Sequence, residues 1–327
     1  MRYRPKAGLV SVLLTLCALA WPADAAPPVD FATWLLEFRA EARQAGVSNV
    51  TLDRSLEGVQ PIERVVELDR SQPEGRMTFA TYRSRVISDK RVADGRRLLA
   101  DNRDLLERVS ARYGVPPEVI VALWGLESSY GRYKGDFRVV DALATLAYEG
   151  RRSDLFRREL LSALKIVDQG HMTADELRGS WAGAMGQSQF MPSTYLGYAQ
   201  DLDGDERADI WNSLPDVFAS IANYLSKAGW DPRYIWGRPV TLPRGGLADE
   251  QVGLSTRRAL PEWQRLGVRT TERASLPAVD IDASVVQPDP DGDAFLVYDN
   301  FRSVMVWNRS TYFALSVGLL ADRIRHG

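Results

Sequence analysis

The sequence predicts a mainly helical protein with a small mixed α/β insertion near its C-terminus. Amphipathic helical patterns recur from about residue 31 to residue 228, and after Trp236 prolines and glycines punctuate short β-type runs. The composition is that of a globular chain, because 45% of the 327 residues are apolar and 26% are charged. This length suits an enzyme of two or three parts better than a protein with one small core.

Residues 1–25 are predicted to be a secretory signal peptide. A basic start with Arg2, Arg4 and Lys6 precedes an apolar run over 7–21, and the Ala-Asp-Ala sequence that ends at residue 25 has the small residues of a cleavage site. The apolar run is shorter than the roughly 20 residues that cross a bilayer. No later stretch is apolar enough to cross one, so a membrane span is not expected. The predicted location is the periplasm.

The one cysteine of the chain, Cys17, lies inside that apolar run and follows Thr15 and Leu16. A bacterial lipoprotein signal has small residues just before its cysteine, so a lipid anchor is not expected here. The mature chain is then expected to hold no disulfide and to use no thiol chemistry.

Residues 26–100 are predicted to form a helical N-terminal region. Phe31, Trp34 and Phe38 recur on one helical face, and Gly46 follows as a stop. After a looser stretch, helical sequence resumes at about Met77.

Residues 101–236 are predicted to form the core of the protein. Pro117 suits the first turn of a helix, and the segment 179–212 between later helices is dense in Gly, Ser, Asn and Asp. Loops of this kind on a helical scaffold often carry function. The helices expected in this part of the chain cover residues 98–114, 117–131, 154–167 and 216–228.

Residues 237–294 are the predicted mixed insertion, and residues 295–327 are expected to return to the core as a strand and a helix. Val240–Leu242 is one β-type run of the insertion. Phe295–Trp307 is rich in Val, Phe and Tyr and is predicted to be a strand or a hairpin. Ser310 is expected to cap the last helix.

The charge and the residue content exclude several functions. Loss of the signal peptide removes three positive charges and one negative charge, which changes the formal net charge from -2 to -4. A mildly acidic protein is not attracted to nucleic acid or to an anionic membrane surface. A serine triad and a catalytic zinc site are not expected, because His171 and His326 are the only histidines and the mature chain lacks cysteine. The chain also lacks a phosphate-binding GxxxxGK motif.

Glu127 is the leading candidate for a catalytic residue. It lies four residues after Leu123 and seven after Ile120, so it shares their apolar helix face. Because a carboxyl group beside Leu123 and Trp124 loses hydration, its pKa is expected to rise toward that of a general acid at neutral pH. The pattern alone leaves open a second interpretation, a solvated or hydrogen-bonded glutamate at a helix end.

Three segments give the sequence a family resemblance. Residues 125–131 (GLESSYG), followed by 141–147 (DALATLA), resemble one signature of the membrane-bound lytic transglycosylase B family. Residues 179–195 (GSWAGAMGQSQFMPSTY) resemble its second signature and 308–312 (NRSTY) its third. The three segments occur in the expected order and span most of the mature chain.

The resemblance implies a lysozyme-like catalytic core and a lytic transglycosylase that acts on the glycan strands of peptidoglycan. Glu127 would protonate the β-1,4 bond between N-acetylmuramic acid and N-acetylglucosamine, and then take the proton of the muramyl C6 hydroxyl to give a 1,6-anhydro end. The substrate's acetamido group would replace the second carboxylate that most glycoside hydrolases use. No cofactor is then required for catalysis, and other cell-wall enzymes are possible partners.

The resemblance also assigns a substrate-binding set. Tyr224 matches a tyrosine that helps to position the glutamate. Trp307 departs from the family pattern, because the founding members carry a tyrosine there, and tryptophan can stack on a sugar but has no hydroxyl acceptor. The matched positions are Ser180, Gln189, Phe190, Met191, Tyr224, Trp307 and Asn308.

The loop over 201–216 has the oxygen-ligand spacing of an EF-hand, with aspartates at relative positions 1, 3, 5 and 9. Position 6 is Glu206 in place of glycine and position 12 is Asn212 in place of glutamate. Some family members carry a variant loop that a later carboxylate closes, and Asp216 is its counterpart here. A structural Ca²⁺ is therefore predicted, with a solvated acidic turn as the alternative. The candidate ligands are the side chains of Asp201, Asp203, Asp205 and Asp216 and the main-chain carbonyl of Arg207.

Two other functions stay open at this stage. A hydrolytic muramidase would need a second positioned carboxylate, for which Asp136, Asp141 and Glu149 are the candidates. The second alternative is a protein that binds peptidoglycan but has lost its catalytic site. The presence of Glu127 and of the complete 179–195 segment argues against it.

Overall fold

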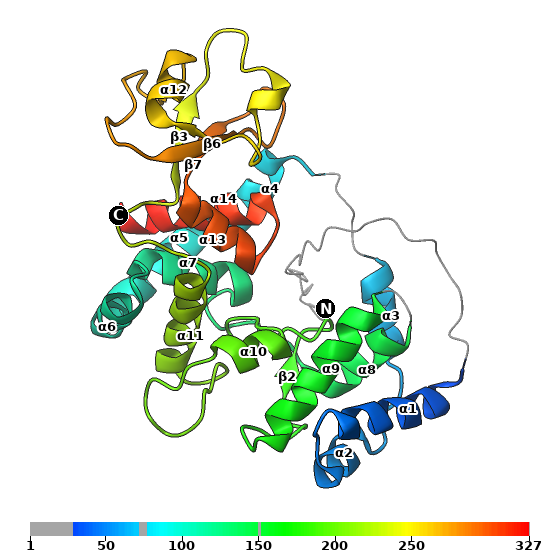
Figure 1. The fold of residues 1–327 in the computed structure, drawn as a ribbon. Coiled ribbons are helices and arrows are strands. Elements are labelled where there is room, and N and C mark those ends of the chain that lie inside the picture. The colour runs from blue at the N-terminus through cyan, green and yellow to red at the C-terminus, as the bar shows by residue number, and fades with distance from the viewer. Residues whose placement is uncertain (1–28, 72–76, 150–151, 327) are drawn as a thin grey trace, which may run out of the picture.

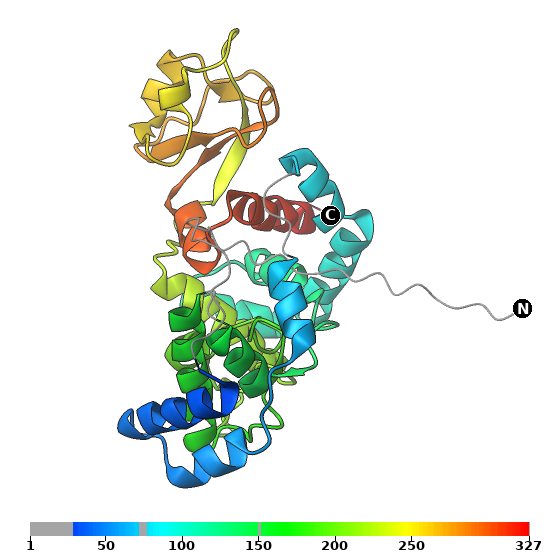
Figure 2. The same cartoon turned by 90° about the vertical axis from the view of Figure 1, so that its right-hand side faces the viewer.

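The computed structural model describes residues 29–71, 77–149 and 152–326, and its fold is mainly helical as predicted. The expected signal peptide and Cys17 lie outside the described residues. Among the helices of the described residues, none is long and apolar enough to cross a membrane. Figures 1 and 2 show the small sheet at one end of the molecule and the first helices of the chain toward the other end.

From residue 29 to residue 128, the described residues form helices and the short connections between them. Side chains of Asp30, Ser48, Thr78 and Ser88 each accept a hydrogen bond from the backbone N–H three residues later and so cap the helices that follow them. The helices are α1 (Phe31–Gln44), α2 (Asn49–Leu56), α3 (Glu63–Arg70), α4 (Phe79–Val86), α5 (Asp89–Asp101), α6 (Arg103–Tyr113) and α7 (Pro117–Ser128).

The segment from 137 to 227 continues the helical part. Its two short strands pair antiparallel, with Phe137 opposite Gly179. The elements are β1 (Phe137–Arg138), α8 (Val139–Tyr148), α9 (Ser153–Asp168), β2 (Arg178–Gly179), α10 (Pro192–Tyr198) and α11 (Leu214–Lys227).

The rest of the chain forms the small sheet and two final helices. The sheet is antiparallel with the strand order β4-β6-β7-β3-β5. Trp263 is fully buried against it and donates its ring N–H to the Ala283 carbonyl at 2.9 Å. The elements are β3 (Gly237–Thr241), the 3-10 helix η1 (Asp249–Gln251), β4 (Arg258–Ala259), α12 (Leu260–Arg265), β5 (Arg269–Thr270), β6 (Asp282–Val286), β7 (Ala294–Val297), α13 (Asp299–Trp307) and α14 (Thr311–Arg325).

Helix α7 lies at the centre of the fold. Each of its residues from Glu118 to Ser128 is buried, as expected for a helix that is apolar all round. Pro117 stands in its first turn, where a missing backbone N–H costs nothing. Helices α5, α6, α11 and α14 pack around α7, so the end of this helix is held from several sides.

The N-terminal helices divide between two places in the fold. Helices α2 and α3 pack on α8 and α9, whereas α4 and α5 pack on α14, with α5 also on α7. Residues 26–100, expected as one region, are therefore associated with both ends of the helical part. Strand β7 is similarly shared, because Phe295 and Val297 join the large apolar core while Ala294 and Leu296 join that of the small sheet.

Two sequence-based expectations were wrong. Residues 98–114 do not form one helix, because the chain breaks at Asn102, whose side chain donates to the Leu98 carbonyl at 2.8 Å and competes with the helical bonds. Residues 299–307 form α13 rather than a strand or hairpin. Phe301 and Val304 are buried on one face of that helix, so tertiary packing outweighs the β propensity of the segment.

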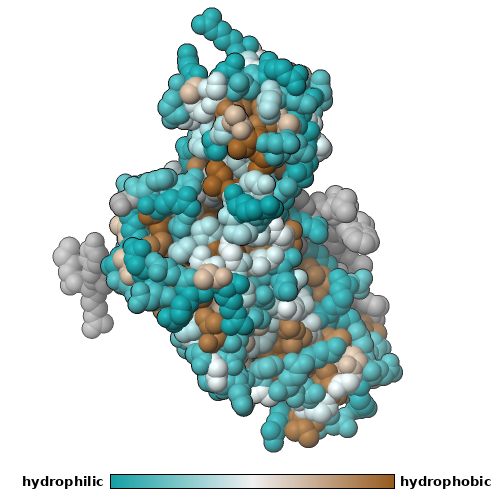
Figure 3. All heavy atoms as spheres, turned by 60° about the vertical axis from the view of Figure 1, so that its left-hand side comes forward, coloured by the Kyte–Doolittle hydropathy of each residue, from teal (hydrophilic) through white to brown (hydrophobic). Residues whose placement is uncertain are grey.

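The face drawn in Figure 3 is mainly hydrophilic, with hydrophobic side chains visible in separate patches. Large exposed hydrophobic side chains include Leu36, Val50 and Val306, which come from α1, α2 and α13. Val306 stands directly before Trp307, at the end of α13, where the site described next is built.

Candidate active site

Glu127 lies in the last turn of α7 and is only 5% exposed. The indole N–H of Trp307, at the end of α13, donates to Glu127 Oε1 at 2.7 Å. This bond joins two helices whose residues are 180 positions apart in the chain. It also fixes one carboxylate oxygen and leaves Oε2 as the atom that a substrate can use.

Burial raises the pKa of Glu127 from 4.5 to about 7, because the charged form loses hydration. The hydrogen bond from Trp307 acts in the opposite direction, since it favours the carboxylate. The net result is a carboxyl group that is close to half protonated near neutral pH. A group of this kind can both give and accept a proton under physiological conditions.

The chain after Glu127 is held in an uncommon conformation. Ser129, Tyr130 and Gly131 have φ of 51°, 63° and 78°, three consecutive residues in the left-handed region. A side chain at Gly131 would place its Cβ 2.2 Å from Gln187 Oε1. Strain of this kind persists only where surrounding contacts impose it, and it is concentrated at functional sites.

Several hydrogen bonds impose that conformation. The Ser128 hydroxyl oxygen accepts from Gly131 N at 3.0 Å, and Tyr130 donates its hydroxyl to the Arg91 carbonyl at 2.7 Å. Gln187 Oε1 accepts from the Trp124 ring N–H at 2.8 Å, and its Nε2 donates to the Trp211 carbonyl at 2.8 Å. The 179–195 segment is thereby fastened to the helix that carries Glu127.

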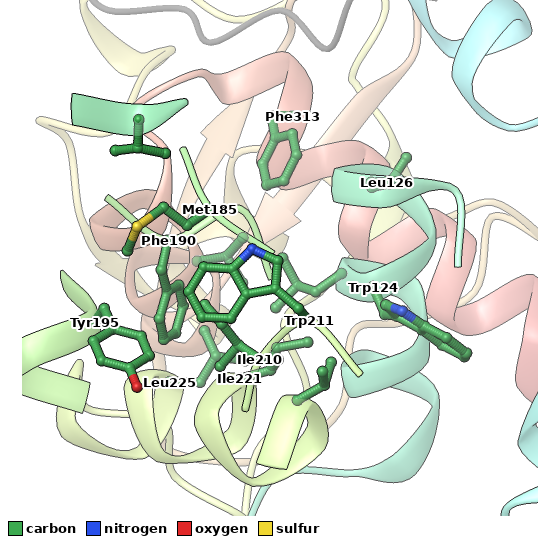
Figure 4. Packing of buried hydrophobic residues seen from close by; sticks show 14 of the residues in the cluster. Trp124, Leu126, Met185, Phe190, Tyr195, Ile210, Trp211, Ile221, Leu225 and Phe313 are labelled. Carbon is green, nitrogen blue, oxygen red and sulfur yellow. The ribbon is translucent and has the colours of Figure 1, made fainter. Parts of the chain in front are cut away.

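Trp307 is held by an aromatic cluster. Its ring centroid lies 4.9 Å from that of Tyr224 and 5.3 Å from that of Phe190. The Tyr224 hydroxyl donates to the Val306 carbonyl at 3.0 Å. Tyr224 thus contacts the end of α13, which carries Trp307, and its expected role in positioning the glutamate stays a prediction. Figure 4 shows Phe190 near Met185 in the buried hydrophobic cluster.

The other expected substrate-binding residues lie on the segments that surround this cluster. The Ser180 hydroxyl oxygen accepts from Ala184 N at 3.0 Å, and Asn308 Oδ1 accepts from Ser310 N at 3.0 Å. Gln189 has φ of 51° and donates from Nε2 to the Gly186 carbonyl at 2.9 Å. Met191 stands at the start of α10. Gln189 Nε2 also donates to the Lys134 carbonyl at 3.4 Å, and the other bonds of these side chains are local. Their roles toward a sugar stay predictions.

Tyr82 of α4 is a site residue that the sequence analysis missed. Its pKa is raised to about 12, mainly by burial and also by the charge of Glu127. Its ring centroid lies 5.8 Å from that of Tyr312. Burial also raises the pKa of Tyr312, so both hydroxyls stay protonated at neutral pH. No local pattern marks Tyr82, because only the packing of α4 on α14 brings it to the glutamate.

The acidic loop forms a second cluster. One carboxylate oxygen from each of Asp201, Asp203 and Asp205 lies within 4.8 Å of the others. Among the described residues, none of the three forms an ion pair with a lysine or arginine. Converging carboxylates without a cationic partner suit a hard divalent cation, so the donor set fits Ca²⁺. Glu206, at the position where glycine is usual, accordingly has φ of 71°.

Asp216 is fully buried at the start of α11 and closes the acidic loop. Its Oδ1 accepts from Leu202 N at 2.7 Å and its Oδ2 from Asp209 N at 2.8 Å. It therefore ties both ends of the loop to α11. The cluster of converging oxygens comprises the three earlier aspartates, so the contribution of Asp216 as a ligand stays a prediction.

The three candidates for a second catalytic carboxylate have other positions. Asp141 pairs with Arg138 of β1, and Glu149 pairs with Arg70 at 3.2 Å. Asp136 is exposed. Within the described part of the chain, none of the three shares a hydrogen bond or an ion pair with Glu127 or Trp307.

Solved structures with this fold place the site in a known class. The structure titled SltB3 from Pseudomonas aeruginosa in complex with NAG-anhNAM-pentapeptide matches with a TM-score of 0.87 and 44% identity, over 91% of this chain and 80% of that one. The Escherichia coli lytic transglycosylase Slt35 in complex with calcium matches with a TM-score of 0.77 and 29% identity, over 89% and 92%. The fold and the site define a lytic transglycosylase with a lysozyme-like core.

The sequence comparisons give the family. The family model described as Transglycosylase SLT domain matches residues 30–322. The membrane-bound lytic murein transglycosylase B of Escherichia coli strain K12 is 33% identical over 260 residues, which is 78% of this chain and 69% of that protein. The chain therefore belongs to the transglycosylase SLT domain family, and the resemblance found in its motifs is confirmed.

Proposed function

We propose that this enzyme cleaves the β-1,4 bond between N-acetylmuramic acid and N-acetylglucosamine in peptidoglycan and leaves a 1,6-anhydromuramyl end. The observation that carries the proposal is Glu127, a buried carboxyl group with a pKa of about 7 and one fixed oxygen. The names of the relatives support the substrate, since one is a murein transglycosylase and another was solved with NAG-anhNAM-pentapeptide.

In the first step, Glu127 donates its proton to the glycosidic oxygen as the bond from that oxygen to the anomeric carbon breaks. The carbonyl oxygen of the substrate's acetamido group takes up the positive charge that develops at the anomeric carbon. Because Oε1 accepts the Trp307 N–H, the proton is carried on Oε2. The described contacts give Glu127 no carboxylate partner, which suits a reaction in which the substrate supplies the second nucleophile.

In the second step, the Glu127 carboxylate takes the proton of the muramyl C6 hydroxyl, and that oxygen forms the new bond to the anomeric carbon. Glu127 returns to its acid form and no water is consumed. Glu127 is only 5% exposed, and Phe190 and Tyr224 pack on the Trp307 ring that contacts its carboxyl group. This arrangement favours the internal hydroxyl over hydrolysis.

The test is a digest of purified sacculi, with the released muropeptides measured by mass spectrometry. Anhydro ends are expected, whereas reducing ends would identify a hydrolytic muramidase and would overturn the proposal. Glu127→Gln removes the proton carrier and keeps the shape, so release is expected to fall by at least about 10³-fold. Circular dichroism of the variant checks that the fold is kept, and full activity of a folded Glu127→Gln protein would exclude the assigned role.

We further propose that the acidic loop binds a structural Ca²⁺ through Asp201, Asp203 and Asp205, with the Arg207 carbonyl and Asp216 completing the site. When bound, the ion would neutralise carboxylates that now repel one another and would stiffen the loop beside α11. Calcium is expected to raise the melting temperature by a few degrees, since a ligand of the folded state stabilises it by mass action. Asp203→Asn combined with Asp205→Asn should remove this shift, and an unchanged shift would disprove the site.

The periplasm remains the proposed location. It rests on the predicted signal peptide over residues 1–25 and on the substrate proposed above. Detection of a mature protein that starts after residue 25 in a periplasmic extract is the direct test.

A further inference from the structure

A pocket of about 470 Å³ lies beside the acidic loop. Its walls come from residues 132–136, which follow the strained turn after α7, from 171–178, which lead into β2, and from 207–212 of the loop itself. Tyr195 of α10 completes it. Neither Glu127 nor the aromatic cluster around Trp307 is part of these walls. The volume is within the usual range for a small-ligand site.

The lining holds four cationic side chains and three carboxylates, those of Asp136, Glu176 and Asp209. Arg132, Lys134, Arg178 and Arg207 all face the pocket. Arg132 is already paired with Asp94. The other three form no ion pair with a carboxylate among the described residues.

The three remaining cations use neutral partners. Lys134 Nζ donates to the Trp211 carbonyl at 3.2 Å. Arg178 donates to two main-chain carbonyls, at 2.9 and 3.2 Å. Arg207 donates to the His171 carbonyl at 3.1 Å. These hydrogen bonds to main-chain carbonyls orient the three cationic side chains and do not supply a counter-charge.

The carboxylates of the pocket wall are largely engaged elsewhere. Asp209 Oδ1 accepts the backbone N–H groups of Trp211 and Asn212, at 2.9 and 3.0 Å. Glu176 accepts from the backbone and hydroxyl of Thr173, and these bonds lower its pKa. The charge of Arg207 also helps to lower the pKa of Glu176. Lys134 and Arg178 are therefore the cations of this wall that an entering anion can meet outside any described ion pair.

The pocket is linked to the active site by short connections. The Trp211 ring N–H donates to the Arg178 carbonyl at 2.8 Å, and the Trp211 carbonyl accepts from Gln187, which in turn holds Trp124 of α7. Figure 4 shows Trp211 in the same buried cluster as Trp124 and Tyr195. The Lys134 carbonyl also accepts weakly from Gln189 Nε2, at 3.4 Å. One side of this wall thus belongs to the predicted sugar-binding segment.

We propose that this pocket binds a carboxylate of the peptide stem that peptidoglycan strands carry. The inference rests on the proposed function, because that function supplies a substrate with peptide carboxylates next to the scissile sugar. Arginine and lysine together bind carboxylates through charge-assisted hydrogen bonds. Trp211, Tyr195 and Met172 give the same pocket an apolar wall for a peptide side chain.

The experiment compares strands that carry peptide stems with strands from which an amidase has removed them. The variant is Lys134→Gln combined with Arg178→Gln, and the control is Arg103→Gln on α6, which changes charge at a side chain that is 61% exposed. On peptide-bearing strands, KM is expected to rise about tenfold in the double variant, as for the loss of charge-assisted hydrogen bonds. On peptide-free strands, its KM and kcat should match those of the unmodified enzyme.

The outcomes separate the two proposals. If the double variant loses nothing on peptide-bearing strands, the pocket does not bind the stem, while anhydro ends from either substrate still support the proposed function. If the unmodified enzyme gives no anhydro ends from either substrate, the proposed function itself fails. Calorimetric titration with inorganic phosphate and with free stem pentapeptide, on folded Glu127→Gln protein, distinguishes the ligands. Phosphate binding that equals or exceeds peptide binding would overturn the stem assignment.

Discussion

Glu127 at the end of α7 and Asp216 at the start of α11 are both buried carboxylates, but different donors reach them. Glu127 accepts one hydrogen bond from a side chain, the Trp307 indole. Asp216 accepts two from the backbone, from Leu202 and Asp209. Burial raises the pKa of both groups, and only at Asp216 do backbone N–H groups oppose that rise.

The difference separates a reactive carboxylate from a structural one. Backbone donors bind both Asp216 oxygens in place and make that side chain part of the loop. Glu127 keeps Oε2 out of any described hydrogen bond, so this oxygen is available for proton transfer. Burial alone therefore does not distinguish the two carboxylates; burial together with an unused oxygen is what supports the catalytic role that we propose for Glu127. The following changes test this contrast.

The largest expected effect is on the pH dependence of activity. Glu127 must be protonated in the free enzyme to act first as an acid, and its pKa is about 7. We expect kcat/KM to approach a tenfold fall per pH unit above that value, and to fall by about 50-fold between pH 7, where half of the Glu127 carboxyl groups are protonated, and pH 9. The measurement is the initial rate of anhydromuropeptide release across that range.

A pH-independent rate from pH 6 to pH 9 would contradict the assignment of Glu127 as the acid. Far-UV circular dichroism at each pH provides the control, because unfolding at alkaline pH would also lower the rate.

The second effect is on stability. The folded-state pKa of Glu127 is raised from 4.5 to about 7, so the folded protein binds this proton more tightly and loses stability as pH rises through that window. Glu127→Gln removes the loss. The unfolding free energy of the variant minus that of the unmodified protein should therefore rise by about 2 to 3 kcal/mol from pH 4.5 to pH 8, at about 1.4 kcal/mol per pKa unit. Urea unfolding at both pH values measures it.

An equal free-energy difference between the two proteins at both pH values would show that the glutamate is not desolvated in solution. Glu262→Gln on α12 is the matched control, because it makes the same substitution at a side chain that is 44% exposed.

The sequence predicted the position of Glu127 and the start of its helix, because Pro117 and a fully apolar run determine both locally. Ser310 was likewise expected at the start of α14, and its side chain accepts from Phe313 N at 3.3 Å. The bond from Trp307 was not predictable, because 180 residues separate the two groups. Tyr82 and the helix α13 were missed for the same reason: their roles depend on packing between elements that are distant in the chain.

The third effect is a loss of stability at the structural carboxylate. Asp216→Ala leaves the N–H groups of Leu202 and Asp209 without their acceptor, and an unpaired buried donor costs about 1–3 kcal/mol. We expect the unfolding free energy to fall by about 2 kcal/mol and the calcium-dependent rise in melting temperature to disappear. The fraction of the Asp216→Ala protein that stays folded is expected to keep its activity on peptidoglycan. Asp280→Ala, at an exposed position, should change neither quantity, and the same result for Asp216→Ala would remove the contrast with Glu127.

The smallest effect tests the donor that distinguishes Glu127. Trp307→Phe keeps an aromatic ring beside Tyr224 and Phe190 but removes the N–H that donates to Oε1. Because that bond favours the carboxylate, its loss should move the alkaline limb of kcat/KM to higher pH. The freed carboxyl group is also less well oriented, so kcat should fall by about tenfold, as for a hydrogen bond to a charged group.

Trp236→Phe is the matched control for this change. It also removes an indole N–H from a carboxylate, that of Asp322 at 3.1 Å, but in the core of the fold and away from Glu127. It should lower stability and leave the pH profile unchanged. If Trp307→Phe likewise lowers stability without moving the pH limb, Trp307 only packs, and the glutamate is set by burial alone. If the limb moves, one donor on one oxygen adjusts the proton affinity while the other oxygen remains available to the substrate.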